Sequence, residues 1–558
     1  MNSIQFPREP QALRLAPKLL QIIAILFALG PISGFSDSSL IAIPTEIPVP
    51  KDPAKSLRWK ARLVENLEEK LPRDSHPGFS LAQQHCSSCH LTPLPEHESR
   101  ETWPFVLNWM LNYLGYPNHG GLFDGLVEHH LIPEEPAISE TDLQTLAEYF
   151  QIYSAPEDEH RALNQRDHPP LSQFKMFGIR SGIPSGSTVT MVHFDDERDQ
   201  YFFGWGNKSK LRLHDINGKL LMEIPMKSEP IHLETTQTGF QVTGIGHFLL
   251  QANLGHVLEV ETEGGKLLRS KTLIENQTRM TQALRTDLNN DQITDLVLVG
   301  FGDGLEGEVS VRWGDSSGSY AEKTVLIDYS GGLNAAVHDF NADGLKDVVL
   351  LTSQRQQELL IFINEGERAF EQNTILKRFA GFGFNHLALE DFNDDDQVDI
   401  LLCNGNNTEI DFAPIKPYHG IQILENQGGL SFTKKFEFPL YGATKSVTAD
   451  FDLDGDLDIA TIAFYPDWAA KLPTTFVYLE NRGSYDFQPS TVEQADWGRW
   501  ISMASGDIDN DGYPDLLLGG AYYPIGVGPN DSATYRRLTQ NKPAIVLLKN
   551  VGNSPAGQ

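Results

Sequence analysis

A short acidic motif that recurs five times along the chain is the sequence feature that most restricts its fold. Each copy has Asp or Asn at its first, third, fifth and ninth positions and leads into an apolar run such as LVLVG or VVLL. The copies begin at Asp287, Asp339, Asp391, Asp450 and Asp507, so the repeat length is 52 to 59 residues. Self-similarity at such a period is typical of repeat architectures, in which each copy forms one supersecondary unit.

A second motif, Asn-x-Gly followed by Phe, comes after three of the acidic motifs in the same register, at Asn364, Asn426 and Asn481. Asn and Gly tolerate a positive φ, which suits a tight turn between two strands. Each repeat then contains four strands, the content of one β-propeller blade. Residues 171–286 have room for two more repeats, so we predict about seven four-stranded blades over residues 171–553. The last repeat stops at Asn550-x-Gly552, and we expect a strand from residues 171–185 to complete its blade.

Oxygen ligands at alternating positions around a tight turn suit Ca²⁺, which takes six to eight hard oxygen ligands. An EF-hand is excluded because position 12 of each motif is Leu or Thr instead of Glu. We therefore expect the Asp at position 9 to close the site, and up to five calcium ions. The predicted ligands are Asp287, Asn289, Asp291, Asp295, Asp339, Asn341, Asp343, Asp347, Asp391, Asn393, Asp395, Asp399, Asp450, Asp452, Asp454, Asp458, Asp507, Asp509, Asp511 and Asp515.

At these residues the chain resembles the FG-GAP/VCBS repeat family of calcium-binding propellers. The loops that begin at Asp450 and Asp507 have Asp at all four ligand positions, so they are expected to bind calcium most strongly. The loop at Asp287 is expected to be the weakest, because Gln292 is a poor residue for a left-handed turn. We expect the calcium ions to hold the blades together and not to signal.

Residues 86–90 have the sequence Cys-Ser-Ser-Cys-His, which is the attachment motif of a c-type haem. Cys86 and Cys89 would each bond a vinyl group of one haem, and His90 would coordinate the iron. Two alternatives fit less well. A zinc site lacks a second pair of cysteines, and a thioredoxin-like redox pair requires a βαβ setting, whereas the surrounding pattern is helical.

Helical periodicity predicts helices over residues 57–71, 79–90, 102–114 and 139–153. Together with the haem motif, residues 57–155 resemble a small all-α class I cytochrome c. The resemblance implies a second axial ligand, usually Met, and Met110 is the one methionine between residues 35 and 170. The alternatives for this ligand are His119, His129 and His130.

The remaining segments indicate export. Residues 1–34 combine basic residues, a 12-residue apolar run and small residues, as in a secretory signal, although a retained N-terminal anchor is the alternative. Residues 35–56 and 156–170 are expected to be linkers, since both contain several prolines. We expect a periplasmic, secreted or cell-surface protein without a transmembrane span after signal removal. A formal charge of −31 argues against nucleic acid as a partner.

In an up-and-down blade, the acidic loop and the Asn-x-Gly turn lie on one face, so the longer loops lie on the other. Long loops on a rigid scaffold often carry function. The residues expected at this possible binding face are His386, Lys445, Trp468, Trp497, Arg499, Trp500, Tyr522 and Tyr523. The aromatic side chains either form an exposed platform for a glycan or a protein, or they pack the loops themselves. Polar residues at equivalent strand positions, Lys445 and His386 among them, are expected to line the mouth of the channel.

These observations favour an exported monohaem cytochrome that transfers electrons to or from a redox partner protein, with the calcium-stabilised propeller as its docking or ligand-binding module. One alternative is an oxidoreductase whose substrate lies on the propeller face and reduces the haem. The other is an adhesion or carbohydrate-binding propeller with an accessory haem. The sequence contains no arrangement of a nucleophile and a base, so electron transfer or binding is favoured over catalysis.

Overall fold

The structure is a computed structural model, which describes residues 71–87, 91–116, 132–162, 168–247, 253–302, 306–354, 356–407, 413–470, 473–522, 532–540 and 542–552. The chain divides into two compact units. Among the described residues, 105–116 and 132–141 belong to the smaller unit, and all others belong to the larger unit.

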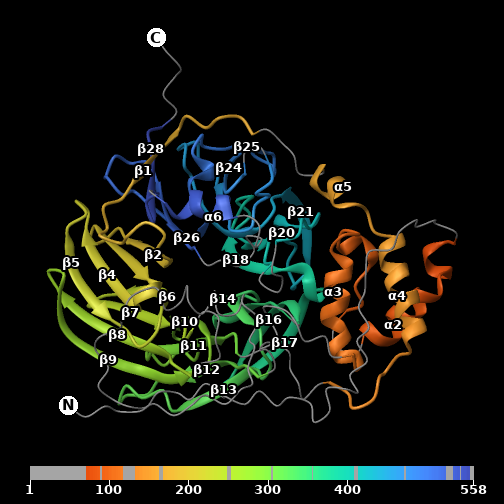
Figure 1. The fold of residues 1–558 in the computed structure, drawn as a ribbon. Helices are drawn as coiled ribbons and strands as arrows, with labels where there is room; N and C mark the ends of the chain where they lie inside the picture. The colour runs from red at the N-terminus through yellow and green to blue at the C-terminus, as the bar shows by residue number, and fades with distance from the viewer. Residues whose placement is uncertain are drawn as a thin grey trace, which may run out of the picture. The chain divides into compact units, whose positions relative to one another are not determined.

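Seven four-stranded antiparallel sheets surround a common centre in the larger unit (Figure 1). The first two blades contain β2 (Val189–Asp195), β3 (Gln200–Trp205), β4 (Lys210–Asp215) and β5 (Leu220–Pro225), and then β6 (Pro230–Thr236), β7 (Gly239–Gly244), β8 (Gly255–Glu263) and β9 (Lys266–Gln277). The third and fourth contain β10 (Met280–Thr286), β11 (Asp295–Gly300), β12 (Val309–Trp313) and β13 (Glu322–Ile327), and then β14 (Gly332–His338), β15 (Asp347–Thr352), β16 (Gln357–Gly366) and β17 (Ala369–Arg378). The fifth and sixth contain β18 (Phe384–Glu390), β19 (Asp399–Asn404), β20 (Gly420–Asn426) and β21 (Phe432–Pro439), and then β22 (Ala443–Ala449), β23 (Asp458–Ala463), β24 (Phe476–Asn481) and β25 (Phe487–Ser490).

The seventh blade joins the two ends of the propeller. It contains β26 (Trp500–Gly506), β27 (Asp515–Gly520), β28 (Ile545–Asn550) and β1 (Phe174–Gly178), with β1 antiparallel to β28 and Phe174 opposite Asn550. The innermost strands contact one another in the order β2, β6, β10, β14, β18, β22, β26 and back to β2, so the ring is closed. The predicted seven blades and the predicted strand from residues 171–185 are both confirmed.

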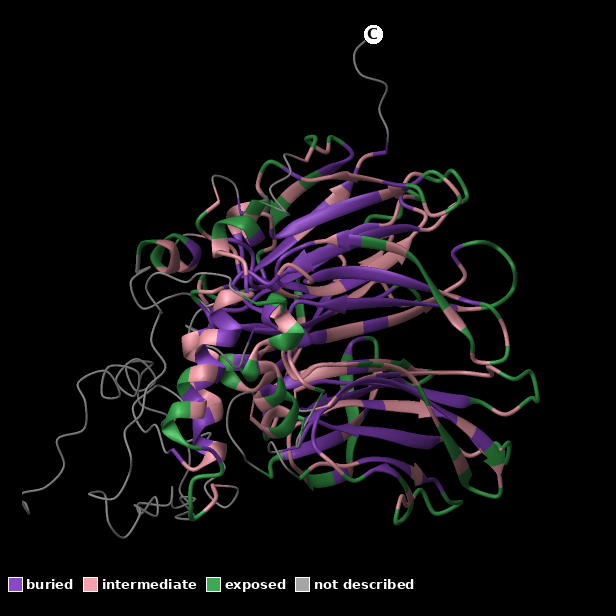
Figure 2. Cartoon of the chain, turned by 90° about the vertical axis from the view of Figure 1, so that its right-hand side faces the viewer, coloured by how far each residue is buried: buried purple, intermediate pink, exposed green. Residues whose placement is uncertain are grey.

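The core consists of apolar layers between neighbouring blades. The second strands β11, β15, β19, β23 and β27 are buried along their whole length, because each of their two faces packs against an adjacent blade. One layer, for example, contains Val297 and Val311 of the third blade with Val348 and Leu360 of the fourth. Figure 2 shows the buried strands and the exposed turns at their ends. Truncation of a fully buried side chain such as Leu360 to Ala would cost about 2–5 kcal/mol.

The helices precede the propeller, apart from α6 (Ser532–Thr539) in the seventh blade. They are α2 (Pro77–Cys86), α3 (Trp103–Met110), α4 (Glu140–Ile152) and α5 (Glu157–Ala162), with short 3-10 helices at η1 (Arg73–Ser75), η2 (Pro95–His97) and η3 (Leu111–Leu114). Three of the four predicted helices are present, and the predicted helix over residues 57–71 lies outside the described residues. Gly115, at a φ of 86°, ends the third one as expected. Within the predicted linker over residues 156–170, α5 occupies residues 157–162.

In the larger unit, α2 and α4 cross at very close range. A Cβ on Gly78 would lie 2.3 Å from the Cβ of Tyr149, so only glycine fits at this crossing. The Trp103 ring stacks on Phe150 with ring centroids 3.9 Å apart, and its Nε1 donates a hydrogen bond of 2.8 Å to the carbonyl of Pro95. These contacts bury the aromatic side chains and fix the segment that carries the Cys86 thiol.

Candidate functional site

The aspartate at the ninth position of each acidic loop is completely buried and holds the loop in place. In the fourth blade, Asp347 Oδ2 accepts from the N–H of Phe340 at 2.8 Å, and its Oδ1 accepts from the N–H of Asn364 at 2.8 Å. The same pair of bonds recurs in the other four loops, at Asp295, Asp399, Asp458 and Asp515. The carboxylate therefore fastens the loop to the turn at the end of the third strand, which is Asn-x-Gly in all of these blades except the third, a role that the sequence argument did not assign.

The carboxylates at positions 1, 3 and 5 converge in two of the loops. The oxygens of Asp450, Asp452 and Asp454 lie within 4.8 Å of one another, as do those of Asp507, Asp509 and Asp511. These are the two loops that the sequence ranked highest. In the first of them, Asp452 Oδ1 is buried and has no hydrogen-bond partner among the described residues. Three convergent carboxylates and an unsatisfied buried oxygen fit a divalent cation with hard-oxygen preference.

The residue next to each Asn-x-Gly turn distinguishes these two loops. Lys549 pairs with Asp509 and lies 3.4 Å from Asp511, so the loop at Asp507 already has a cation among its carboxylates. The strand register places Glu480 at the equivalent position of the sixth blade, beside the loop at Asp450. The loop at Asp450 is therefore the better fit for a calcium ion, although the sequence ranked the two loops equally.

Two positions of each acidic loop have a left-handed backbone. At position 6 the φ angles are 67° for Gln292, 87° for Gly344, 64° for Asp396, 104° for Gly455 and 90° for Gly512. The left-handed conformation inferred for Gln292 is therefore present. Position 4 is also left-handed, at Asn290, Ala342, Asp394, Leu453 and Asn510, with φ between 56° and 62°. Sequence reasoning missed this position, because Ala and Leu give no signal of a positive φ.

The haem motif is only partly within the described residues. Cys86 is the last residue of α2, its thiol is free and half-buried, and burial raises its pKa to about 12. Cys89 and His90 lie outside the described residues, as do His119, His129 and His130. Met110 is half-buried at the end of α3, in the smaller unit.

Two of the aromatic side chains at the possible binding face are buried. Trp500 is 0% exposed and Arg499 is 1% exposed, so both belong to the interior of the sixth and seventh blades. Arg499 donates from Nε to the carbonyl of Phe464 at 3.0 Å, and its guanidinium lies 3.7 Å from the centroid of the Phe464 ring. Tyr522 is also buried, Trp468 and Trp497 are half-buried, and Tyr523 lies outside the described residues. Of the two alternatives for the aromatic side chains, packing holds for Trp500 and Tyr522, and Trp500 is enclosed because it begins an inner strand.

The polar residues predicted at the channel mouth occupy the bulge of each inner strand, and several of them join neighbouring blades. Gln282 Oε1 accepts from the N–H of Ala335 at 2.6 Å, and Asn334 Oδ1 accepts from the N–H of Leu387 at 2.8 Å. Burial lowers the pKa of His386 to about 3, and it also lowers the pKa of Lys445. The two residues therefore share a desolvated environment.

Residues of the N-terminal segment lie against long loops of the propeller within the larger unit. The His97 ring stacks on Phe379 with centroids 3.5 Å apart and an interplanar angle of 11°. Lys416 Nζ lies 3.5 Å from Glu98 Oε1, and both side chains are buried. Arg161 of α5 forms an ion pair with Asp467. Part of the face predicted to bind a ligand is thus covered by this chain itself.

Comparisons with known proteins give a consistent result for the repeats. Residues 287–350 and 339–402 match the FG-GAP-like repeat, and residues 499–535 match the FG-GAP repeat. Integrin alpha-V of Gallus gallus is 25% identical over 234 residues, which are 38% of this chain and 22% of the integrin. Integrin alpha-5 of Xenopus laevis is 26% identical over 219 residues, which are 34% of this chain and 19% of the integrin. This chain thus spans about a fifth of the length of these relatives.

A solved structure, the β-propeller domain of Cps50 (Swd1) from Myceliophteria thermophila, covers 68% of this chain and 99% of its own, with 11% identity and a TM-score of 0.41. No helix in the described parts of the chain is long and apolar enough to span a membrane. The repeats matched in sequence coincide with blades three to five and seven of the structure. The chain therefore carries FG-GAP repeats within a seven-bladed β-propeller.

Proposed function

We propose that this protein is exported, that its helical N-terminal segment carries one covalently bound c-type haem for electron transfer, and that its propeller, stabilised by calcium, docks a redox partner. The observation that carries the proposal is the Cys-Ser-Ser-Cys-His motif at the end of helix α2. Five residues of such a motif seldom occur together by chance in a chain with three cysteines.

Of the four residues that would hold the haem, Cys86 and Met110 are described, and a thiol and a thioether are the groups that these two roles need. Cys86 is a free, half-buried thiol at a helix end, so it is available for a thioether bond. Cys86 and Cys89 would form the thioether bonds, His90 would be one axial ligand, and Met110 is proposed as the other. When bound, the haem supplies a one-electron redox centre. The α2–α4 crossing at Gly78 and the stacked Trp103 and Phe150 rings fix the helix that presents the first thiol.

Calcium belongs to the same proposal as a structural ligand. Asp450, Asp452 and Asp454 would hold one ion, and the orphaned Asp452 Oδ1 supports this assignment. The buried Asp458 connects the loop to the neighbouring turn, because it accepts hydrogen bonds from the N–H groups of Phe451 and Asn481. An ion in this loop would therefore stabilise the sixth blade.

An absorption spectrum of the full chain, produced in cells that have a c-type haem maturation system, tests the haem assignment. We expect a reduced spectrum with sharp α and β bands, and the colour should stay with the protein after acid–acetone extraction. A Cys86→Ala and Cys89→Ala double variant is the matched control and should be colourless. Haem that moves into the solvent, or wild-type protein without haem, would contradict the proposal.

A second candidate function is adhesion or ligand binding without electron transfer. The similarity to integrin alpha-V and integrin alpha-5 favours it, because it covers more than a third of this chain. The two functions differ in one measurement. Binding of a partner that is unaffected by removal of the haem cysteines and that causes no change in the oxidation state of the haem would favour adhesion.

A further inference from the structure

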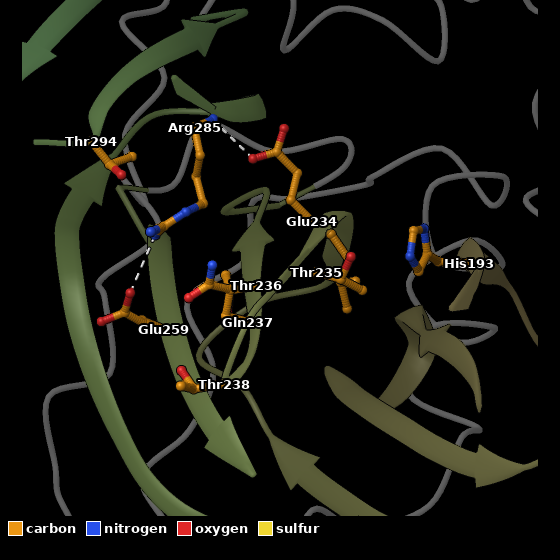
Figure 3. A pocket seen from close by; sticks show the side chains of 10 residues that line it. His193, Glu234, Thr235, Thr236, Gln237, Thr238, Glu259, Arg285 and Thr294 are labelled. Atoms are coloured by element: carbon orange, nitrogen blue, oxygen red, sulfur yellow. Dashed lines mark hydrogen bonds and ion pairs between the residues drawn. The ribbon is translucent and has the colours of Figure 1, made fainter. Parts of the chain in front are cut away.

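The second blade differs from blades three to seven because no acidic loop joins its first two strands. Strands β6 and β7 are joined by the two-residue turn Gln237–Thr238, whereas an acidic loop of eight residues joins β10 to β11 in the next blade. A cavity of about 710 Å³ lies here, within the size range of small-molecule sites (Figure 3). It is lined by His193, Leu233, Glu234, Thr235, Thr236, Gln237, Thr238, Glu259, Arg285 and Thr294.

The charged side chains around this cavity differ in their ion pairs. Arg285 Nη1 is 3.2 Å from Glu259 Oε1 and 3.3 Å from Gln241 Oε1, so its charge is already balanced. Glu234 Oε2 accepts from the backbone N–H of Arg285 at 2.8 Å. Among the described residues, no side-chain cation lies within ion-pair distance of Glu234 Oε1. Figure 3 shows Glu234 beside Arg285, with His193 on the opposite side of the cavity.

The β6–β7 turn, which carries the threonines and forms one wall of the cavity, is bound by residues outside the cavity. Arg198 of the first blade pairs with Asp195 through Nη1 at 2.6 Å, and its Nη2 donates to the carbonyls of Thr236 and Gln237 at 2.5 and 3.1 Å. The backbone N–H of Thr262 closes the other side of the turn by donating to the carbonyl of Thr238 at 2.9 Å. Because backbone groups are bound in this way, the cavity is preorganised, and a ligand would not have to order the turn.

The lining discriminates between classes of ligand. An anion would meet Glu234 and Glu259 and would find the single arginine already neutralised. An apolar ligand would find one apolar residue, Leu233, which is buried beneath the polar lining. Burial raises the pKa of Glu234 to about 7, which is the response of a carboxylate that has lost water without gaining a full counter-charge.

We propose that this cavity binds an organic cation, a primary ammonium or guanidinium group, with Glu234 as its charge partner and the threonine hydroxyls as additional acceptors. The overall charge of −31 would also attract such a ligand over distance and weaken its binding at high salt. The cation comes either from a free small amine or from a lysine or arginine side chain of a docked protein, and both share this chemistry.

Isothermal titration of the full chain with four probes tests the proposal. The probes are putrescine, agmatine, a lysine-containing tripeptide with blocked ends, and glucose as a neutral polyol. The test variant is Glu234→Gln, which removes the charge but leaves a side-chain oxygen that can accept from the backbone N–H of Arg285. The control is Glu275→Gln on β9 of the same blade, where the carboxylate pairs with Lys227 outside the cavity.

We expect the cationic probes to bind to wild-type protein and to the Glu275→Gln variant, and to bind about tenfold more weakly to Glu234→Gln, since a charge-assisted hydrogen bond is lost. Tighter binding of the tripeptide than of the free amines would identify a protein partner as the source of the cation, and the reverse order would identify a small amine. Equal binding to Glu234→Gln, equal binding of glucose, or no binding of any cationic probe would overturn the proposal. Thermal unfolding of both variants checks that the fold is intact.

Discussion

Changes of charge at Lys549 and Glu480 should alter the calcium dependence of the seventh and sixth blades in opposite directions. Both residues occupy the same register position beside an acidic loop, and they carry opposite charges. Lys549 lies 3.4 Å from Asp511, and the two side chains are 32% and 36% exposed. At that distance, water-like screening gives an attraction of about 1 kcal/mol. We therefore expect Lys549→Gln to destabilise the chain by about 1 kcal/mol when calcium is chelated.

The same variant should respond more strongly to calcium. Without Lys549, the carboxylates of Asp507, Asp509 and Asp511 have no ion-pair partner among the described residues. A bound ion at a hundredfold excess over Kd then contributes about 2.7 kcal/mol. The reciprocal variant, Glu480→Lys, places an ammonium beside Asp452 and should reduce the calcium response of the loop at Asp450.

The assay is denaturant unfolding of the full chain in chelator and in calcium, with titration calorimetry to count the ions. Lys549→Gln should bind one more ion than the wild-type protein, and Glu480→Lys should bind one fewer. An exposed lysine outside the loops, Lys434, gives a control as Lys434→Gln. Equal calcium-dependent stabilisation in all four proteins would refute the reasoning that Lys549 replaces the ion.

Three further predictions follow from single contacts. Leu453→Asn, which introduces the residue found at this position in two other loops, should raise the free energy of unfolding by about 0.5–1 kcal/mol, because Leu453 is 51% exposed and has a φ of 62°; an unchanged denaturation midpoint would argue against strain. Lys416→Met should cost about 3 kcal/mol, because it leaves the buried Glu98 carboxylate without its ammonium, and a second change, Glu98→Gln, should restore part of the loss, as measured by unfolding and by proteolysis of the helical segment. The raised pKa of Glu234, about 7, means that its contribution to stability is complete below its ordinary pKa of 4.5 and is lost as pH rises through 7. The difference in free energy of unfolding between wild-type protein and Glu234→Gln should therefore change by roughly 1–3 kcal/mol between pH 4 and pH 9. The other charged or titratable groups that line the cavity are Glu259, Arg285 and His193.

The propeller could be predicted from the sequence because its determinants are local and repeated. Each acidic loop requires its carboxylates and its turn within nine residues, and each hairpin requires its Asn-x-Gly turn, so five copies reinforced one another. Even the closure of the ring followed from a count of strands, because the last repeat lacked a fourth strand that only residues 171–185 could supply. The helices over residues 102–114 and 139–153 were predictable for the same reason, since periodicity and a terminal glycine are local signals.

The features that the sequence could not predict depend on contacts between distant residues. The position-9 aspartates satisfied the chemistry of a calcium ligand, and nothing local indicated that strand geometry would place backbone donors on both of their oxygens. Trp500 and Arg499 follow a loop and appeared suited to a surface, yet packing of the sixth blade against the seventh encloses them. The role of Lys549 requires the register between β27 and β28, which only the folded sheet defines.

The cavity proposed to bind a cation lies at a departure from sevenfold repetition. In blades three to seven, the aspartate at position 9 of each acidic loop accepts hydrogen bonds from backbone N–H groups. The other carboxylates of these loops are suited to binding a cation. On the side of the long loops, the contacts of His97 with Phe379 and of Glu98 with Lys416 occupy surface of the fifth blade. The second blade has neither feature, because its β6–β7 turn is too short to form an acidic loop. The open cavity beside the incompletely balanced carboxylate of Glu234 therefore lies where the ring departs from the acidic-loop pattern. If this cavity binds a cation as proposed, substitutions there should alter binding without disturbing the acidic loops of the other blades.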